Sequence, residues 1–424
     1  MIYLVFTLMC FIFGGAYYLF NKDFFSPGMI YIESFLLASL MAVIYKNEWG
    51  VNYEFQFLAL IIGVMIIFLF FAYLIKYVKK RVKVLHGLIK KTNRRQIKPI
   101  HLHIGYLTFF LLLSIIGVCL YFREVYRIAK ELGNTNGVSG MFYVYHNKYL
   151  LSAGKTNVKV NSIIELLNRI NMIFAYYFSY VFCNNCFRYK EKLARNVPYL
   201  FFAFIYMIGL FIGSQRTGII YLLFSILFMA FIITRQNHNW KQADISTLKI
   251  VFFSLMAVVV LACGLKWLGE LMGRTNHQNA MHYFAGYLGG GIPNIARFLQ
   301  NHKLCLLSEC MGAADINTFW SYLGVRCNLS TWLSGSARMG LLKYIFYAII
   351  VSCSYAHFYY AYLYKCKITS FSDYILVVYG YAVQGLLFVG LTDIIISHMM
   401  GMGYLFFCIM VWFLDGFCRL KSKN

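Results

Sequence analysis

The sequence predicts an all-α protein, a polytopic membrane bundle of about eleven transmembrane helices. Hydrophobic residues make up 61% of the 424 residues and charged residues only 13%, whereas soluble domains carry about 25% charged residues. The mean hydropathy is +0.64. Apolar stretches of about twenty residues, long enough to cross the hydrocarbon core of a bilayer, recur along the chain. We therefore expect one transmembrane domain, residues 1–424, without a sizeable soluble domain.

Hydropathy places the helices in order along the chain. The first apolar stretch has no basic region before it and no small-residue cleavage site, and Lys22 and Asp23 lead directly into the next stretch. It therefore predicts a retained helix and not a signal peptide. The predicted spans are 2–20, 29–45, 57–75, 104–122, 162–183, 198–213, 217–234, 248–268, 338–364, 371–391 and 394–415.

The distribution of basic residues predicts the orientation. Segment 76–103 contains ten Lys and Arg and no acidic residue, which is typical of a cytoplasmic loop. Alternation then puts the N-terminus outside and the C-terminus inside, and the other short basic loops agree. The net charge of +24 is explained by these loops, so it does not indicate a nucleic-acid partner.

Two segments on the predicted outer face are long, 123–161 and 269–337, the second between the eighth and ninth spans. Both alternate aromatic and aliphatic residues with polar ones, in stretches too short to span. We expect amphipathic or re-entrant elements on the outer leaflet. Long loops of compact membrane proteins often carry function.

Arg216 stands out in the short segment Gly213–Gly218 between two predicted spans. The positive-inside rule disfavours a cation in a short outer loop. The positive end of the helix dipole disfavours it at a helix start. An anionic partner explains Arg216 best, and an interfacial arginine that extends toward lipid headgroups is the alternative.

A second cationic feature lies in segment 269–337. Gly289, Gly290 and Gly291 precede Pro293 and Arg297, a pattern that predicts a tight turn into a helix with Pro293 at its first position. Backbone N–H groups at such a start bind anions. Close packing against a neighbouring helix is the alternative explanation for the glycines.

Arg338 at the start of the ninth span would add a third outer cation. His282 and His302 are candidate general bases near an acceptor hydroxyl, with Glu309 and Asp315 as alternatives. The sequence has no Walker A, H-E-x-x-H or G-x-S-x-G motif, and no cofactor or metal is expected.

Six segments of the chain form a recognisable set: Asn21–Gly28, the turn at Trp49, Gly213–Thr217, Tyr287–Ile292, Asn317–Trp320 and Asn328–Leu333. In these segments the chain resembles Wzy-type oligosaccharide repeat-unit polymerases of O-antigen, capsule or exopolysaccharide assembly. It departs from them at Ala296–Arg297 and Ser336–Met339, where family members often carry an acid.

The resemblance implies a multi-pass protein of the bacterial cytoplasmic membrane whose substrate is an oligosaccharide linked to undecaprenyl diphosphate. The growing chain passes to the distal sugar of another lipid-linked unit on the outer face, and undecaprenyl diphosphate leaves. A chain-length regulator and a flippase are the expected partners. The expected diphosphate ligands are Arg216, Arg297, Arg338 and Arg274, and the residues expected to stack on sugars are Trp320, Tyr322 and Trp332.

Three other functions remain open at this point. An O-antigen ligase uses the same donor but another acceptor. A lipid-linked oligosaccharide flippase would transport the same lipid. A membrane scaffold or a polysaccharide export partner would be unaffected by substitution of the outer arginines.

Overall fold

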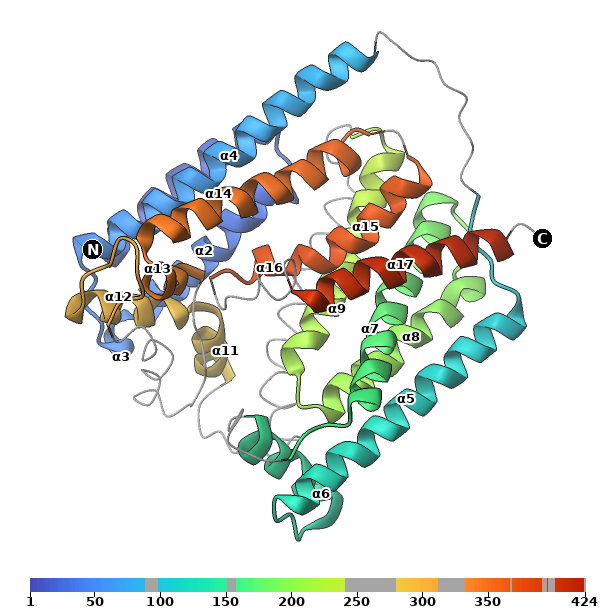
Figure 1. Ribbon diagram of the computed structural model, residues 1–424. Helices are drawn as coiled ribbons and strands as arrows, with labels where there is room; N and C mark the ends of the chain where they lie inside the picture. Colours follow the sequence, from blue (N-terminus) through green and yellow to red (C-terminus); the bar gives the residue numbers. More distant parts are fainter. Residues whose placement is uncertain are drawn as a thin grey trace. The chain divides into compact units, whose positions relative to one another are not determined.

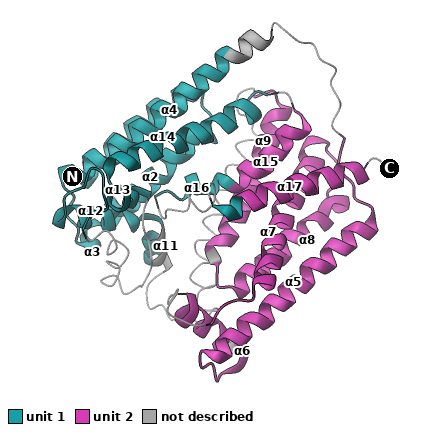
Figure 2. Cartoon of the chain, viewed as in Figure 1, with its two compact units in different colours: residues 1–95, 278–367, 382–404 teal, residues 96–277, 368–381, 405–424 magenta. Residues whose placement is uncertain are grey.

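The computed structural model describes residues 1–87, 98–150, 158–240, 280–311, 332–366, 368–390, 395 and 401–422, apart from a few side chains. Within these ranges all regular elements are helices (Figure 1). The chain forms two compact units (Figure 2). Unit 1 comprises residues 1–95, 278–367 and 382–404, and unit 2 comprises 96–277, 368–381 and 405–424.

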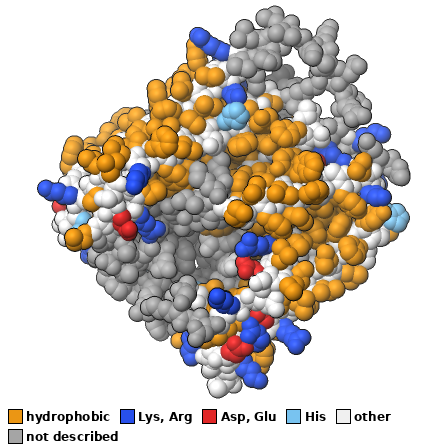
Figure 3. Space-filling model, viewed as in Figure 1, with side chains coloured by type: hydrophobic (Ala, Val, Ile, Leu, Met, Phe, Trp, Pro, Cys, Tyr) orange, Lys and Arg blue, Asp and Glu red, His pale blue; other side chains and the backbone are white. Residues whose placement is uncertain are grey.

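Eight described helices are long and apolar enough to cross a membrane, which confirms a helical membrane bundle. Hydrophobic side chains cover much of the helix surface on the face in view (Figure 3), and such a surface suits lipid rather than water. These helices are α1 (Ile2–Leu19), α2 (Pro27–Ile44), α4 (Phe55–Gly87), α5 (Ile104–Glu131), α8 (Leu193–Ile212), α9 (Arg216–Asn237), α14 (Leu341–Phe358, continued by η6, Tyr359–Leu363) and α17 (Met402–Lys421). The candidate span is Phe55–Arg81 within α4, Thr217–Asn237 within α9, and α14 together with η6.

The predicted count of eleven is not confirmed. The predicted span 162–183 is present as α7, Ser162–Cys183, but polar residues in its first half make it less apolar than the eight. The predicted span 371–391 is replaced by α15 (Ser370–Ala382) and α16 (Gln384–Leu387), each too short to cross alone. The predicted span 248–268 lies outside the described residues.

Unit 1 is built on α1, α2, α4 and α14. Lys76 donates through Nζ to the carbonyl oxygen of Leu19, which places the end of α1 beside the later part of α4. Ser352 of α14 donates to the carbonyl oxygen of Phe68 of α4 at 2.6 Å. The remaining elements are α3 (Lys46–Trp49), α11 (Ala280–Gly289), α12 (Gly291–Asn301), η5 (Trp332–Ser334) and α13 (Gly335–Met339).

Unit 2 is organised around α7. The residues of α7 from Asn171 to Cys183 are buried, except Met172, which is half-buried. α7 begins where Asn161 accepts a hydrogen bond from the Ile163 N–H at 2.9 Å, a typical N-cap. α7 packs against both α5 and α8, and the rings of Phe178 in α7 and Phe202 in α8 stack at 4.1 Å. The other elements are α6 (Gly137–Val144), η1 (Tyr145–Leu150) and η2 (Asn184–Arg188).

Candidate functional site

The hairpin between α8 and α9 in unit 2 holds Arg216. Gln215 donates its N–H to the Leu210 carbonyl oxygen at 2.8 Å, and Ser214 adopts a positive φ of 54°. A Cβ on Gly213 would lie 2.6 Å from the Tyr121 hydroxyl oxygen, so a larger residue here would require the Tyr121 side chain to move. α9 begins at Arg216, which confirms the predicted short turn with an arginine at a helix start. The side chain of Arg216 lies outside the described part of the structure.

The other described candidates lie at one end of unit 1, which we call the α3 end. It consists of α3, α11, α12, residues 302–311, η5 and α13. Gln300 of α12 donates through Nε2 to the Asn52 carbonyl oxygen, and Cys310 donates its N–H to the Ala337 carbonyl oxygen at 2.8 Å. The first of these contacts joins segments 248 residues apart in the sequence.

His282 forms an ion pair with a residue that the sequence analysis missed. Its Nδ1 lies 2.9 Å from Oε2 of Glu48, and its ring meets the Tyr45 ring edge-on at 5.1 Å. A carboxylate on one imidazole nitrogen orients the ring, which is a common arrangement for a histidine that acts as a base. Glu48 lies 234 positions before His282, so no local pattern linked the two.

Arg297 and His302 lie on and directly after α12. Arg297 is half-buried, and the His302 ring stacks on Phe298 with centroids 4.9 Å apart. The helix between Gly291 and Ala296 is buried. Pro293 is the third residue of α12, so the prediction that it stands first is wrong.

Gly289, the last residue of α11, packs closely against α2. A Cβ on Gly289 would lie 2.5 Å from Cβ of Met41 and 2.8 Å from the carbonyl oxygen of Ala38, both in α2. Gly290 donates its N–H to the Gly286 carbonyl oxygen at 3.0 Å, and Gly291 is buried as the first residue of α12. Packing, the alternative explanation, therefore accounts for Gly289.

Arg338 does not open the ninth span. It lies in the last turn of α13, and α14 begins at Leu341 after Gly340. A cation at a helix C-terminus is favoured by the dipole, so the prediction that Arg338 stands at a helix start is wrong.

Trp332 does not offer a ring to a sugar. It is fully buried in unit 1, where its ring meets Tyr31 at 5.4 Å and Tyr344 at 5.2 Å. Its backbone N–H donates to the Val389 carbonyl oxygen at 2.9 Å, so Trp332 belongs to the core. Arg274, Trp320 and Tyr322 lie outside the described residues.

Unit 2 contains a buried ionic cluster that the sequence did not reveal. Nη1 of Arg188 lies 2.9 Å from Oδ1 of Asp373, and Nη2 of Arg419 lies 3.3 Å from Oδ2 of the same carboxylate. Arg419 also pairs with Asp415 through Nε at 2.8 Å. Two arginines balance two aspartates here, so the cluster joins η2, α15 and α17 and leaves no excess charge for a ligand.

Unit 1 buries acids as well. Tyr359 donates its hydroxyl to Oδ2 of Asp23 at 2.6 Å, and Asp23 is almost fully buried. Oε1 of Glu33, within α2, is buried without a hydrogen-bond partner in the described structure. Ionisable residues inside a membrane are often functional, and this acid is the feature that best supports transport.

Among the described residues no group of three or more His, Cys, Asp or Glu side chains could hold a metal ion. Comparisons with protein-family models, curated proteins and solved structures find no significant match to this chain.

Proposed function

We propose that this protein polymerises undecaprenyl-diphosphate-linked oligosaccharide repeat units into O-antigen, capsular or exopolysaccharide chains on the outer face of the bacterial cytoplasmic membrane. The observation that carries the proposal is Arg216. It stands at the first position of an apolar helix after a three-residue turn, where both the helix dipole and the positive-inside rule disfavour a cation. An anionic substrate group at the membrane surface explains that placement.

The reaction requires a cation and a base. The acceptor hydroxyl attacks the anomeric carbon of the donor, the bond from that carbon to the diphosphate oxygen breaks, and undecaprenyl diphosphate leaves. Arg216 would stabilise the charge that develops on the diphosphate, because a guanidinium donates two hydrogen bonds to phosphate and stays ionised. Arg297, Arg338 and Arg274 are the assisting cations in this scheme.

The proton of the acceptor hydroxyl needs a recipient. His282 is the favoured base, because its Nδ1 lies 2.9 Å from Oε2 of Glu48, which orients the ring, and imidazole is the most common general base in enzymes. His302 remains the alternative base. Its ring lies against Phe298, and no described carboxylate is paired with it.

Arg216→Ala is expected to abolish polymer while the protein remains inserted. Loss of a cation that stabilises the leaving group costs at least about 100-fold in rate. The measurement is a gel of surface glycan from a strain that lacks the gene and carries wild type or variant. Arg169→Ala is the matched control, since Arg169 is a half-exposed arginine of unit 2 paired with Glu165 on its own helix.

Single repeat units with Arg216→Ala and a normal ladder with Arg169→Ala would support the polymerase. A normal ladder from Arg216→Ala would refute the role of this arginine. Polymer that stays on its lipid carrier in the gene-deleted strain would instead identify an O-antigen ligase.

A flippase is the second candidate, and the buried acids Asp23 and Glu33 favour it. A flippase defect leaves lipid-linked repeat units on the cytoplasmic face, whereas a polymerase defect leaves them on the outer face. Accessibility of these units to an external glycosidase in spheroplasts of the deletion strain separates the two functions.

A further inference from the structure

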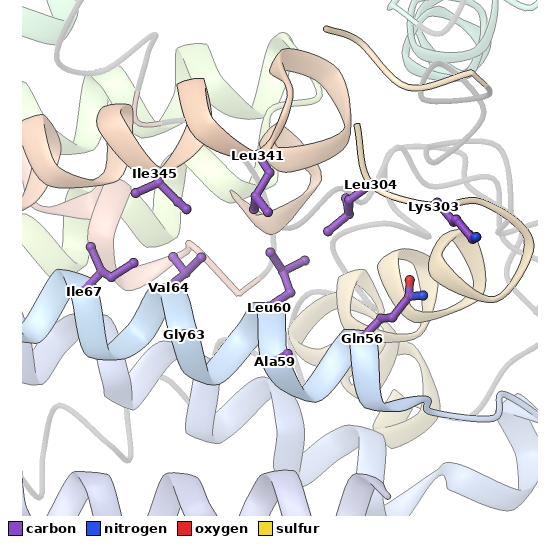
Figure 4. A pocket seen from close by; sticks show the side chains of 10 residues that line it. All are labelled: Gln56, Ala59, Leu60, Gly63, Val64, Ile67, Lys303, Leu304, Leu341 and Ile345. Atoms are coloured by element: carbon purple, nitrogen blue, oxygen red, sulfur yellow. The ribbon is translucent and has the colours of Figure 1, made fainter. Parts of the chain in front are cut away.

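A cavity of about 400 Å³ lies between α4 and α14 in unit 1 (Figure 4). Its walls are almost entirely apolar, and the polar side chains Gln56 and Lys303 lie together at one end of it (Figure 4). The other lining residues are Ala59, Leu60, Gly63, Val64, Ile67, Leu304, Leu341 and Ile345.

The length of the cavity matches one leaflet of a bilayer. Its lining on α4 runs from Gln56 to Ile67, which are about 16 Å apart along a helix. The hydrocarbon core is about 30 Å thick. Because Gln56 lies at the beginning of α4, the cavity extends from the membrane boundary to about the middle of the bilayer.

The surface beside the cavity is suited to lipid. Ile66 and Phe70 of α4 and Leu342 and Phe346 of α14 are large, apolar and exposed. Within the cavity, a Cβ added to Gly63 would meet no atom within 4 Å. The missing side chain leaves open the space that a hydrocarbon chain would fill.

The position of Lys303 at the polar end is fixed by the backbone that follows it. Leu341 and Leu342, the first residues of α14, donate their N–H groups to the carbonyl oxygens of Cys305 and Leu306 at 2.8 and 3.0 Å. Leu306 and Leu307 are more than half exposed, as expected for a segment at the membrane interface.

We propose that this cavity binds one acyl chain of an anionic phospholipid, whose phosphate lies against Lys303. Lys303 is the charged residue among the described lining residues, and one cation matches the single charge of a phosphodiester. A diphosphate carries more charge than one lysine balances. The site is therefore a lipid site distinct from the proposed diphosphate ligand Arg216, and it does not depend on the proposed reaction.

The test uses the full-length protein in phosphatidylcholine nanodiscs that contain phosphatidylglycerol with a diazirine in its acyl chain. Labelled peptides are identified by mass spectrometry. We expect labelling of α4 between residues 56 and 67 and of α14 near Ile345. Phosphatidylglycerol should label about fivefold more strongly than a phosphatidylcholine probe with the same chains, since one lysine near the surface gives a preference of that order.

Two pairs of variants separate the tail from the headgroup. Gly63→Leu should fill the cavity and reduce labelling at least about tenfold by excluding the chain from its apolar site, whereas Gly14→Leu should not, although Gly14 of α1 also has open space around it. Lys303→Gln should abolish the preference for phosphatidylglycerol, and Lys343→Gln, an exposed lysine outside the cavity, should retain it.

Equal labelling by both probes in the wild type would overturn the assignment of the headgroup. Unchanged labelling in Gly63→Leu would overturn the assignment of the cavity. Displacement by an equimolar polyprenyl phosphate, with no displacement by unlabelled phosphatidylglycerol, would also overturn the proposal and assign the cavity to an isoprenoid. Lys303 is exposed, so its substitution remains informative even if Gly63→Leu does not fold.

Discussion

At the scale of single residues, Glu191 shows how a loop carboxylate holds helices of unit 2 together. Its Oε1 lies 2.8 Å from Nε2 of His101, and its Oε2 accepts a hydrogen bond from Asn196 Nδ2 at 3.2 Å. Partial burial by itself would raise the pKa of Glu191. The hydrogen bonds from His101 and Asn196 outweigh burial and hold this pKa below its usual value.

Glu191→Gln is therefore expected to destabilise the protein at neutral pH by about 1–2 kcal/mol. A carboxyl whose pKa is lowered on folding stabilises the folded state above its unfolded pKa, and this contribution is lost as the pH falls through the folded pKa. The difference between wild type and variant should then shrink at acidic pH. Thermal unfolding in detergent, compared at pH 7 and below pH 4, checks this. A difference that stays constant over that range would contradict it.

At the scale of elements, Gly340 determines how α14 begins. Its φ is 87°, and a Cβ there would lie 2.8 Å from the carbonyl carbon of Leu307 and from the backbone nitrogen of Ser308. Both the backbone conformation and the close approach of the segment 306–308 require glycine. Gly50 at the end of α3 has a φ of 56° but open space around it.

Gly340→Ala should therefore destabilise unit 1 more than Gly50→Ala. We expect about 1 kcal/mol for Gly50→Ala, from backbone strain alone, and about 2–4 kcal/mol for Gly340→Ala, where steric overlap adds to the strain. Denaturant unfolding of the two variants in the same detergent measures the difference. Equal decreases in the free energy of unfolding of the two variants would show that steric overlap with residues 306–308 adds little to the cost.

The elements were predictable from sequence to different degrees, for physical reasons. Hydropathy and the Asn161 cap place α7 at its predicted bounds, 162–183. α17 begins at Met402 rather than at 394, because hydropathy averages over a window and does not register the break in the apolar sequence at Ser397, His398 and Gly401.

Contacts between distant parts of the chain were not predictable. Arg216 was placed correctly at a helix start because short turns have local signals. The partnership of Glu48 with His282 and the joining of Arg188, Asp373 and Arg419 depend on tertiary packing. A single sequence contains the residue types but not these distances.

At the scale of the whole molecule, two hydrogen bonds help to predict on which side of the membrane each terminus lies. In unit 1, Lys76 reaches the Leu19 carbonyl oxygen, so the N-terminus of α1 lies at the end opposite the later part of α4. In unit 2, His101 donates its N–H to Ser422 Oγ at 2.9 Å, so the end of α17 lies beside the start of α5. The basic segment that connects α4 to α5 has no apolar stretch long enough to cross a membrane.

These relations predict that the two termini lie on opposite sides of the membrane, with the C-terminus on the cytoplasmic side. The eight candidate helices alone, an even number, would put both termini on one side, so the prediction requires further crossings such as α7. A green fluorescent protein fused after Asn424 should fluoresce, and alkaline phosphatase at the same position should be inactive. A tag before Met1 should be removed by protease added to spheroplasts. If both termini prove to be cytoplasmic, the predicted odd number of crossings is wrong. If the C-terminus is external and the N-terminus is protected from protease, the orientation is the reverse of the one that places Arg216 on the outer face.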